Sequence, residues 1–375
     1  MFHVEHITFG VYVHVPFCLS KCGYCDFCRI TDLALADAYL KALDSEMAGS
    51  LARGLKPRTV YVGGGTPSCL GTERLARLLE SIRHNFDLAD VREFTVECNP
   101  EDVTPELAAT LADGRVDRVS MGAQSLHDPA LRMMGRRHDA QRVTDAIATL
   151  RKAGIGNISV DCIFGLPKVE GYNAADDFRR FAALGVEHLS AYALQYENGS
   201  RFTKMMDEGK LTPLPDDEVA DQYEQLTSIL RDAGYDHYEI SNYARPGREA
   251  LHNSSYWDRT NYYGFGPAAS SYVLGTRWTN TYDVREYVEK DGRAQEFTEG
   301  LEKKEVAEEV IMLGMRTKWG VWPESVPLEF REKFLENVEC EMKRGNVVRQ
   351  ENGSLRIPEE RWMVSDMIIR SLADF

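Results

Sequence analysis

Three cysteines that follow a short apolar strand constrain the fold of this chain more than any other feature. They stand after the alternating run Val11–Val15 with the spacing C-x3-C-x2-C, at Cys18, Cys22 and Cys25. Thiolates this close in one loop favour zinc or an iron–sulfur cluster over a hard cation. Three ligands leave one position of a tetrahedral centre open, whereas a structural zinc site fills it with a fourth ligand. The alternatives are a zinc site completed by Cys28 or His14 and a chance cluster of buried cysteines.

Length and composition indicate a cytoplasmic α/β protein. The 375 residues suffice for one large domain and a smaller one, and 43% of them are hydrophobic without any low-complexity tract. No run of about 18 apolar residues predicts a membrane span, and the first ten residues do not resemble a signal peptide. The net charge of −15 argues against a nucleic-acid partner. The eight cysteines do not form the paired framework of a secreted domain.

Short β-like runs alternate with helical stretches through residues 1–240, the pattern of βα units on a parallel sheet. The expected strands are Val11–Val15, Thr59–Val62, Glu93–Cys98, Asp117–Met121, Asn157–Phe164 and Glu187–Gln195. The expected helices include Leu33–Ala52, Glu73–His84, Ala140–Ala153 and Ala174–Leu184. Six βα units are too few for a closed eight-fold barrel and predict an open, partial (β/α)6 barrel. Ligands then bind at the carboxyl ends of the strands.

The texture of the chain changes after residue 240. The segment 241–300 is rich in Tyr, Asn, Gly and Ser and predicts irregular chain with turns. A small C-terminal α+β domain is expected over 301–375. It begins with the helical run Leu301–Val321 and ends with a hairpin over Val347–Ile357 and a helix over Arg361–Leu372.

The cysteines belong to a longer string, Y-x-H-x-P-F-C-x3-C-x-Y-C-D-F, which begins at Tyr12. It resembles the signature of the radical S-adenosylmethionine (SAM) enzymes, in the branch that contains the oxygen-independent coproporphyrinogen oxidase HemN and the heme chaperone HemW. The resemblance covers nearly the whole chain and also implies the partial barrel. In that family three cysteines hold a [4Fe-4S] cluster, and the amino and carboxylate groups of SAM occupy its open iron. His14 would then orient the cluster loop.

The same resemblance implies a set of SAM-binding residues at strand ends. In Gly63–Pro67, a turn whose glycines let the backbone approach a ligand, the contacts would be Gly64, Gly65 and Thr66. The remaining contacts would be Tyr12, Tyr24, Glu97, Gln124, Arg136, Asp161 and Gln195. Among these, Arg136 would bind the SAM carboxylate through its fork of donors, with Arg137 as the local alternative. Asp161 ends an apolar strand, where an acid is costly unless it meets a partner, and would bind the ribose hydroxyls.

A second motif, H-N-x-x-Y-W, occupies residues 252–257. A histidine beside aromatic residues is usually hydrogen-bonded and partly buried. The motif, however, resembles the hallmark of the HemW-type heme chaperones, which the coproporphyrinogen oxidases lack. An imidazole can ligate heme iron while neighbouring aromatic rings pack on the porphyrin. We therefore expect His252 to contact heme, together with Tyr256 and Trp257.

The resemblance implies a heme chaperone with a SAM-liganded [4Fe-4S] cluster, which passes heme to an acceptor protein such as a membrane respiratory enzyme. The alternatives are an oxygen-independent coproporphyrinogen III oxidase of porphyrin biosynthesis and a radical enzyme that modifies heme, so enzymatic activity stays open. Two features count against the oxidase. HemN-type enzymes carry a long N-terminal extension, but eleven residues precede Tyr12 here. Their cluster loop also ends in C-x2-C-x-C, and the extra thiol of this chain, Cys28, stands one residue later.

Overall fold

Twelve strands of the described chain form one continuous sheet. The computed structural model describes residues 8–26 and 28–375, so most of the segment considered for a signal peptide lies outside it. The strand order is β12-β11-β10-β9-β1-β2-β3-β4-β5-β6-β8-β7. Because β12 and β7 lie at the two edges, the sheet is open in the described chain, as a partial barrel requires.

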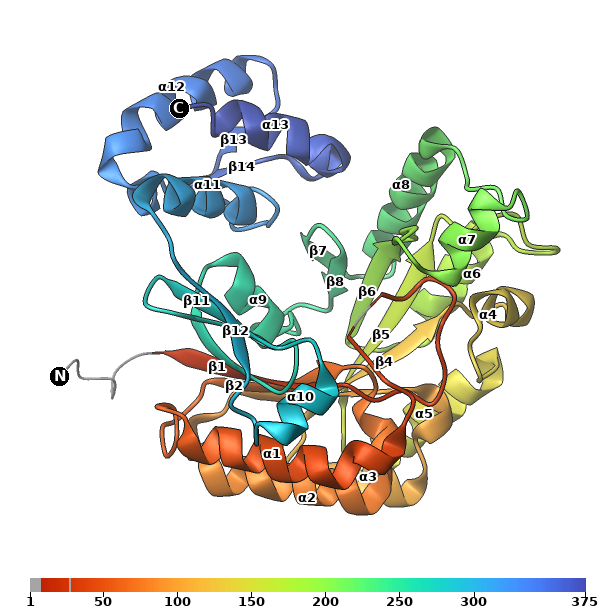
Figure 1. Cartoon of the computed structure of the whole chain (residues 1–375). Coiled ribbons are helices and arrows are strands. Elements are labelled where there is room, and N and C mark those ends of the chain that lie inside the picture. The colour runs from red at the N-terminus through yellow and green to blue at the C-terminus, as the bar shows by residue number, and fades with distance from the viewer. Residues whose placement is uncertain (1–7, 27) are drawn as a thin grey trace.

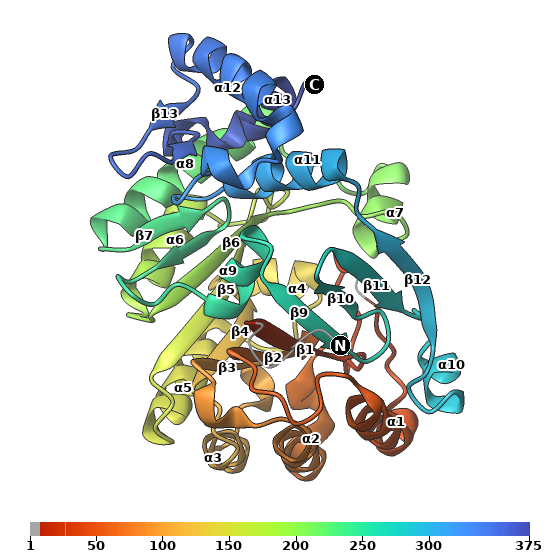
Figure 2. The same ribbon diagram turned by 90° about the vertical axis from the view of Figure 1, so that its left-hand side faces the viewer.

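The first six strands are parallel and follow one another in sequence order, which confirms the predicted βα architecture. They are β1 Phe9–Val15, β2 Thr59–Gly64, β3 Glu93–Cys98, β4 Arg118–Gln124, β5 Asn157–Phe164 and β6 His188–Ala193. Their connections carry α1 Ala36–Gly49, α2 Gly71–Asn85, α3 Pro105–Asp113, α4 Asp128–Met134, α5 Ala140–Lys152 and α6 Ala174–Ala183. Figure 2 shows α1, α2, α3 and α5 along the outer side of the sheet.

The two faces of the parallel sheet differ in polarity. Side chains alternate between the faces with a period of two, and one set is apolar and buried against the helices, as with Val60, Val96 and Val119. The other set is polar although it is also buried, as with Arg118 and His188. A polar interior is costly unless its groups find partners or ligands. The inner side of the partial barrel is therefore the place to look for a site.

The segment 241–300 is mostly regular, so the expectation of irregular chain there is wrong. Its elements are β8 Asn242–Ala244, α9 Leu251–Trp257, β9 Asn261–Phe265, β10 Ser270–Val273, β11 Thr276–Asn280, α10 Val284–Glu289 and β12 Gln295–Gly300. Strand β9 pairs in parallel with β1 and carries the sheet onward through β10 to β12. Tyrosine and threonine favour strands, and Gly264 allows β9 a close approach, since a Cβ there would lie 2.1 Å from the Ser270 carbonyl oxygen.

Two helices and a short strand lie between β6 and β8 in the sequence. They are α7 Arg201–Asp207, α8 Asp216–Asp232 and β7 Asp236–Glu239. The strand β8 pairs with β6 in the antiparallel direction, and β7 pairs with β8.

The C-terminal part has an apolar core of its own. It contains α11 Lys303–Gly314, α12 Leu328–Lys343, the hairpin of β13 Val348–Arg349 and β14 Leu355–Arg356, and α13 Ser365–Leu372. Buried side chains including Ile311, Phe334 and Trp362 form this core, and Figure 1 shows the helices as a separate lobe. The small C-terminal α+β domain is confirmed as an architecture, whereas the boundaries after 240 and 300 stay predictions. Within the described residues, no helix combines the length and apolarity needed to span a membrane.

Candidate functional site

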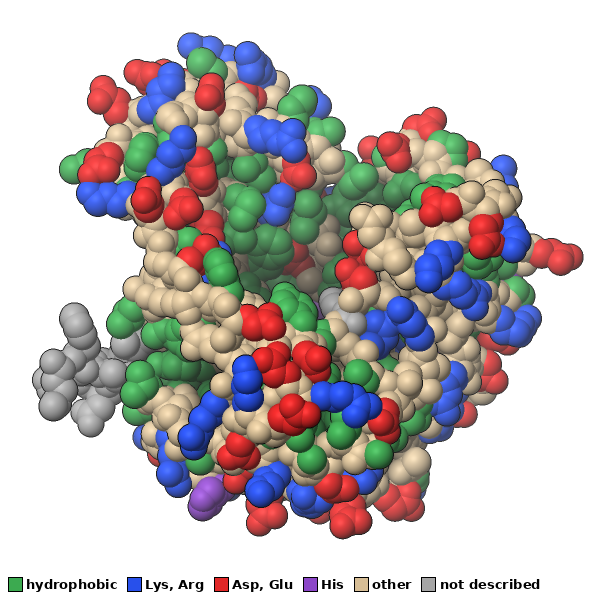
Figure 3. Space-filling model, in the orientation of Figure 1, with side chains coloured by type: hydrophobic (Ala, Val, Ile, Leu, Met, Phe, Trp, Pro, Cys, Tyr) green, Lys and Arg blue, Asp and Glu red, His purple; other side chains and the backbone are tan. Residues whose placement is uncertain are grey.

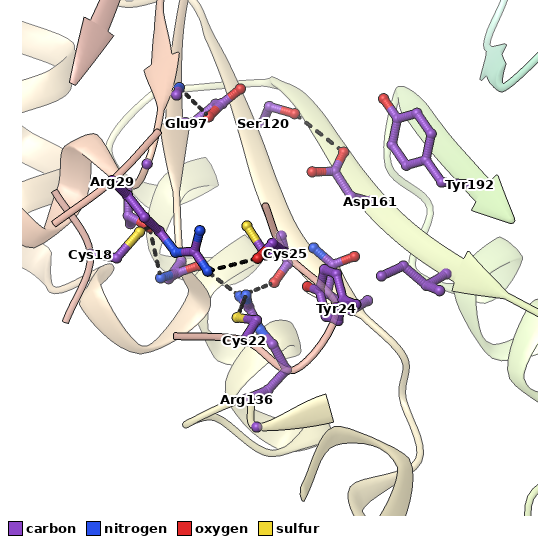
Figure 4. Close-up of a pocket in the computed structure, with 18 of the residues that line it drawn as sticks. Cys18, Cys22, Tyr24, Cys25, Arg29, Glu97, Ser120, Arg136, Asp161 and Tyr192 are labelled. Carbon is purple, nitrogen blue, oxygen red and sulfur yellow. Dashed lines mark hydrogen bonds between the residues drawn. The ribbon is translucent and has the colours of Figure 1, made fainter. Parts of the chain in front are cut away.

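A cavity of about 430 Å³ lies at the carboxyl ends of the parallel strands. Figure 4 shows that its walls carry the cysteine loop on one side and Asp161 and Tyr192 on the other. The predicted residues that line it are Cys18, Cys22, Tyr24, Cys25, Gly64, Gly65, Thr66, Glu97, Gln124, Arg136, Asp161 and Gln195. The fold thus brings together the predicted cluster and SAM residues, with one exception. Tyr12 is absent from the lining.

Backbone hydrogen bonds fix the cysteine loop at its base and its tip. The base closes where the Cys18 amide donates to the Ile30 carbonyl at 3.1 Å. At the tip, the Gly23 amide donates to the Met134 carbonyl and the Gly23 carbonyl accepts from the Phe202 amide, both at 2.9 Å. A Cβ on Gly23 would lie 2.5 Å from the Phe202 ring, so this position requires glycine. The loop is therefore held in place by α4 and α7.

The three thiols fit a cluster better than a single ion. Among the described residues, no three Cys, His, Asp or Glu side chains converge on a point where one metal ion would sit. In a [4Fe-4S] cluster each thiolate binds a different iron, so thiols spread around one cavity suit it. Cys28 is absent from the lining, and its sulfur lies 3.2 Å from the Tyr282 carbonyl. The His14 Nε2 atom lies 2.9 Å from the Cys28 carbonyl oxygen. This geometry favours neither Cys28 nor His14 as a fourth ligand.

Two carboxylates face the cavity in environments that favour their protonated forms. The Glu97 carboxylate accepts from the Tyr61 hydroxyl at 2.6 Å and from the Gly64 amide at 3.1 Å. Burial raises the pKa of Glu97 to about 7, and burial raises the pKa of Asp161 to about 6. An ammonium group or hydroxyls placed between such groups would gain strong hydrogen bonds, because little water competes there. These two acceptors therefore fit the ammonium group and the ribose hydroxyls of SAM.

Arg136 lines the cavity beside the cysteine loop. Its Nη2 atom donates to Asn99 Oδ1 and to the Gly122 carbonyl, both at 2.6 Å, and its Nη1 atom lies 3.3 Å from the Cys22 sulfur. Its Nε atom is buried without a hydrogen-bond partner in the described structure. A buried unpaired donor is costly, and a carboxylate would satisfy it. Because Arg137 also lines the cavity, the choice between the two arginines stays open.

A strained backbone position marks the same wall. Gln124 has a φ of 69°, a region that residues other than glycine seldom adopt. Such positions often occur at ligand sites. Gly64, with a φ of 108°, also requires glycine, because a Cβ there would lie 2.5 Å from the His14 ring.

Sequence reasoning missed several residues of the lining. They are Arg29, Tyr61, Asn99, Ser120, Ser190, Tyr192 and Asn253. Some of them stand on a strand two residues away from another polar residue that faces the cavity side of the sheet. Ser120, for example, is two residues from Arg118 on β4. The period of two was therefore the available signal for these. Asn253 had no such signal, because its helix is not a barrel strand.

The motif H-N-x-x-Y-W forms helix α9 against the inner side of the sheet. This helix differs from the irregular chain that was expected over 241–300. His252 is fully buried, with Nδ1 2.8 Å from the Thr59 hydroxyl and Nε2 2.8 Å from the Tyr256 hydroxyl. Burial lowers the pKa of His252 to about 3. Heme ligation by His252 stays a prediction, and it would require one ring nitrogen to give up its partner. Trp257 is half-buried.

Tyr12 lies beside this helix. Its hydroxyl is 3.0 Å from His14 Nδ1, and its ring centroid is 6.5 Å from that of His252. A SAM contact by Tyr12 therefore stays a prediction for which this arrangement offers no direct path.

Comparisons with known proteins agree with the geometry of the cavity. The family model described as Radical SAM superfamily matches residues 12–180. That match implies a [4Fe-4S] cluster and SAM. A solved structure of coproporphyrinogen III oxidase (HemN) from Escherichia coli has the same fold, with a TM-score of 0.83 over 99% of this chain and 91% of that chain. Its sequence identity is 21%, so the likeness concerns the fold alone.

Curated relatives named heme chaperone HemW are closer in sequence. The protein from Lactococcus lactis subsp. lactis is 38% identical over 87% of this chain and 86% of its own length. The proteins from Mycobacterium tuberculosis and Bacillus subtilis are 40% and 35% identical over 75% and 83% of this chain, and over 74% and 84% of their own lengths. This likeness extends over most of both sequences in each pair. The chain therefore belongs to the radical SAM superfamily and, within it, to the family of the HemW proteins.

Proposed function

We propose that this protein is a heme chaperone, which binds heme, carries a SAM-liganded [4Fe-4S] cluster and passes the heme to an acceptor protein. The observation that carries the proposal is the likeness to relatives named heme chaperone HemW over most of their length. When bound, the cluster would supply one-electron chemistry at its fourth iron. The three cysteines of the loop would hold it.

The cavity offers SAM a separate partner for each polar part. Glu97 suits the ammonium group because its carboxylate accepts hydrogen bonds, and the Gly64–Thr66 turn lines the cavity beside it. The Arg136 guanidinium lines the cavity and suits the carboxylate. Asp161 suits the ribose hydroxyls, with the Ser120 hydroxyl 3.5 Å from its Oδ1 atom.

Exposed aromatic and aliphatic side chains, one of which lines the cavity, support a porphyrin partner. Tyr192 lines the cavity and is 43% exposed, and Leu251 and Trp319 are 37% and 41% exposed. The Trp319 ring lies 5.8 Å from that of Tyr238, whose hydroxyl accepts from the Ala250 amide beside Leu251. Figure 3 shows a hollow lined by hydrophobic side chains between the C-terminal lobe and the rest of the molecule. A heme could bury an apolar face there.

One experiment distinguishes the chaperone from the enzymes. The protein would be reconstituted anaerobically with iron and sulfide, then incubated with SAM and either heme or coproporphyrinogen III. We expect a saturable change in the Soret band, unchanged heme mass, and transfer of the heme to apomyoglobin added as an acceptor. Release of carbon dioxide from coproporphyrinogen III would establish the oxidase instead. A changed heme mass would establish a heme-modifying enzyme.

A further inference from the structure

His252 of helix α9 connects to the SAM cavity through one aromatic side chain, Tyr61. The His252 imidazole stacks on the Tyr61 ring, with centroids 5.2 Å apart and planes inclined by 26°. The Tyr61 hydroxyl, at the other end of that ring, donates to Glu97 Oε1 at 2.6 Å. Tyr61 also lines the cavity and is 8% exposed. The motif histidine is thus one side chain away from a carboxylate of the SAM site.

The imidazole itself is held on every side. Its two nitrogens lie within 2.8 Å of the hydroxyls of Thr59 and Tyr256, and hydroxyls can donate or accept, so the neutral ring is satisfied in either tautomer. Its backbone amide donates to Glu93 Oε1 at 2.9 Å, and the neighbouring Leu251 amide donates to Glu93 Oε2 at 2.8 Å. A buried carboxylate on β3 therefore fixes the start of α9. A ligand to an exogenous iron would need a free nitrogen, and both nitrogens of this buried ring have partners.

We propose that His252 is a positioning residue of the SAM cavity: its ring fixes the Tyr61 ring, so that the Tyr61 hydroxyl stays directed at Glu97. The histidine of the H-N-x-x-Y-W motif then acts on the SAM site indirectly, through Tyr61 and Glu97. This role concerns SAM and holds whether or not the protein binds heme.

The pKa of Glu97 distinguishes the positioning role from a purely structural one. A structural role for His252 would leave this pKa unchanged. Burial raises the pKa of this carboxyl to about 7, and the hydrogen bond from Tyr61 acts against that rise. A displaced Tyr61 ring removes the donor, so the pKa of Glu97 rises further. The other charged or titratable groups that act on it come from β1, β4, β5, β6, α9 and β3 itself: Tyr12, Arg118, Asp161, Tyr192, Tyr256 and Cys98. The proposed change removes none of these groups.

The test measures SAM affinity by calorimetry on anaerobically reconstituted protein between about pH 6 and pH 8.5, a range that brackets the pKa of Glu97. We expect Tyr61→Phe and His252→Ala each to weaken SAM binding about tenfold at neutral pH and to move the pH midpoint of binding upward, as loss of a hydrogen bond to a charged group should. The double variant should be no weaker than Tyr61→Phe alone, because both changes act through one contact. Unchanged SAM affinity and midpoint in His252→Ala, or additive losses in the double variant, would overturn the proposal.

A variant outside the motif tests the same contact in case the His252→Ala protein does not fold. Gly10 on β1 has an ordinary backbone, but a Cβ there would lie 2.8 Å from the Thr59 hydroxyl and 3.1 Å from the His252 ring. Gly10→Ala should therefore shift the imidazole and reproduce the weaker SAM binding and the raised midpoint. Gly156→Ala is the matched control, because its Cβ would meet nothing within 4 Å. Equal SAM affinity and midpoint in the two alanine variants would contradict the positioning role.

Discussion

The SAM cavity and helix α9 are both polar and both largely buried, yet they differ in how their polar atoms are satisfied. In the cavity, Arg136 keeps an unpaired Nε atom, and burial raises the pKa values of Glu97 and Asp161. In the helix, both ring nitrogens of His252 have partners. Unpaired polar groups at a cavity can bind a ligand, whereas a fully paired ring maintains a structure, although the buried Ser254 hydroxyl of the same helix has no partner in the described chain. Both are motifs in the sequence, and the difference is visible only in three dimensions.

The largest expected effect is the loss of the cluster when a cysteine that lines the SAM cavity is replaced. Each of Cys18→Ala, Cys22→Ala and Cys25→Ala should abolish the cluster absorbance of the reconstituted protein, whose wild-type form should carry about four irons per chain. Cys28→Ala is the matched control and should keep its iron, because that sulfur faces the Tyr282 carbonyl. Iron analysis and absorbance spectra measure both. Bound zinc would contradict an iron–sulfur cluster in the cavity, and an equal loss of iron in Cys28→Ala would contradict the set of three ligands.

The next effect concerns the unpaired arginine. Arg136→Ala should weaken SAM binding about ten- to hundred-fold, since a hydrogen bond to a charged group contributes about 1.5–3 kcal/mol. Arg137→Ala is the neighbouring control. Arg136 also contacts the Cys22 sulfur, so iron content is checked in parallel with the calorimetric titration. A loss of SAM affinity that is confined to Arg137→Ala would assign the contact with the SAM carboxylate to Arg137.

The two regions should also respond differently to pH. If SAM needs the Glu97 anion, its affinity should rise with pH up to about 7 and fall by about tenfold per pH unit below it. Folding stability changes in the opposite direction. A carboxyl whose pKa is higher when folded stabilises the chain fully below its unfolded value of 4.5, and this contribution is lost as the pH rises through about 7.

Glu97→Gln separates these two pH effects. This variant should flatten the dependence of denaturant unfolding on pH in that window, and it should bind SAM weakly at every pH. His252, whose pKa is lowered to about 3, stays neutral in the folded chain between pH 5 and pH 8, but its unfolded ring titrates near 6.5 and lowers stability as the pH falls below that value. A pH profile that is unchanged in Glu97→Gln would assign the titration to another group.

The smallest expected effect is on heme affinity, and it indicates which exposed aromatic side chain the heme contacts. Trp319→Ala should weaken heme binding several-fold by removing part of the exposed apolar face, since base-like stacking on one aromatic ring contributes about 0.5–1.5 kcal/mol. Trp322→Ala is the matched control, with a ring that is 45% exposed but lies near Gly353 of the hairpin. Titration followed at the Soret band measures both, together with Trp257→Ala. A loss confined to Trp257→Ala would place the heme against Trp257 of helix α9 and not against Trp319.

The sequence allowed prediction of the features whose chemistry is local. The cysteine spacing, the Gly63–Pro67 turn and the acid at the end of an apolar strand all concern residues near one another in the chain, and the cavity unites them. Tyr61 was not predictable in the same way, because a tyrosine in a strand is ordinary until its hydroxyl meets Glu97. The segment 241–300 was mispredicted in part because its strand β9 pairs with β1 across about 250 residues, and no local pattern reports such a partner.

The pairing of β1 with both β2 and β9 has a consequence for how the protein is made. Domains tend to form from the N-terminus during synthesis, so β1 can pair with β2 long before residues 261–265 leave the ribosome. Until then one edge of β1 stays unpaired, and an unpaired edge is a template for aggregation. Helix α9 directly precedes β9, so the histidine behind the SAM cavity reaches its place at the same late step. We therefore expect a nascent chain that stops before residue 261 to carry all its cluster cysteines and still need protection by chaperones.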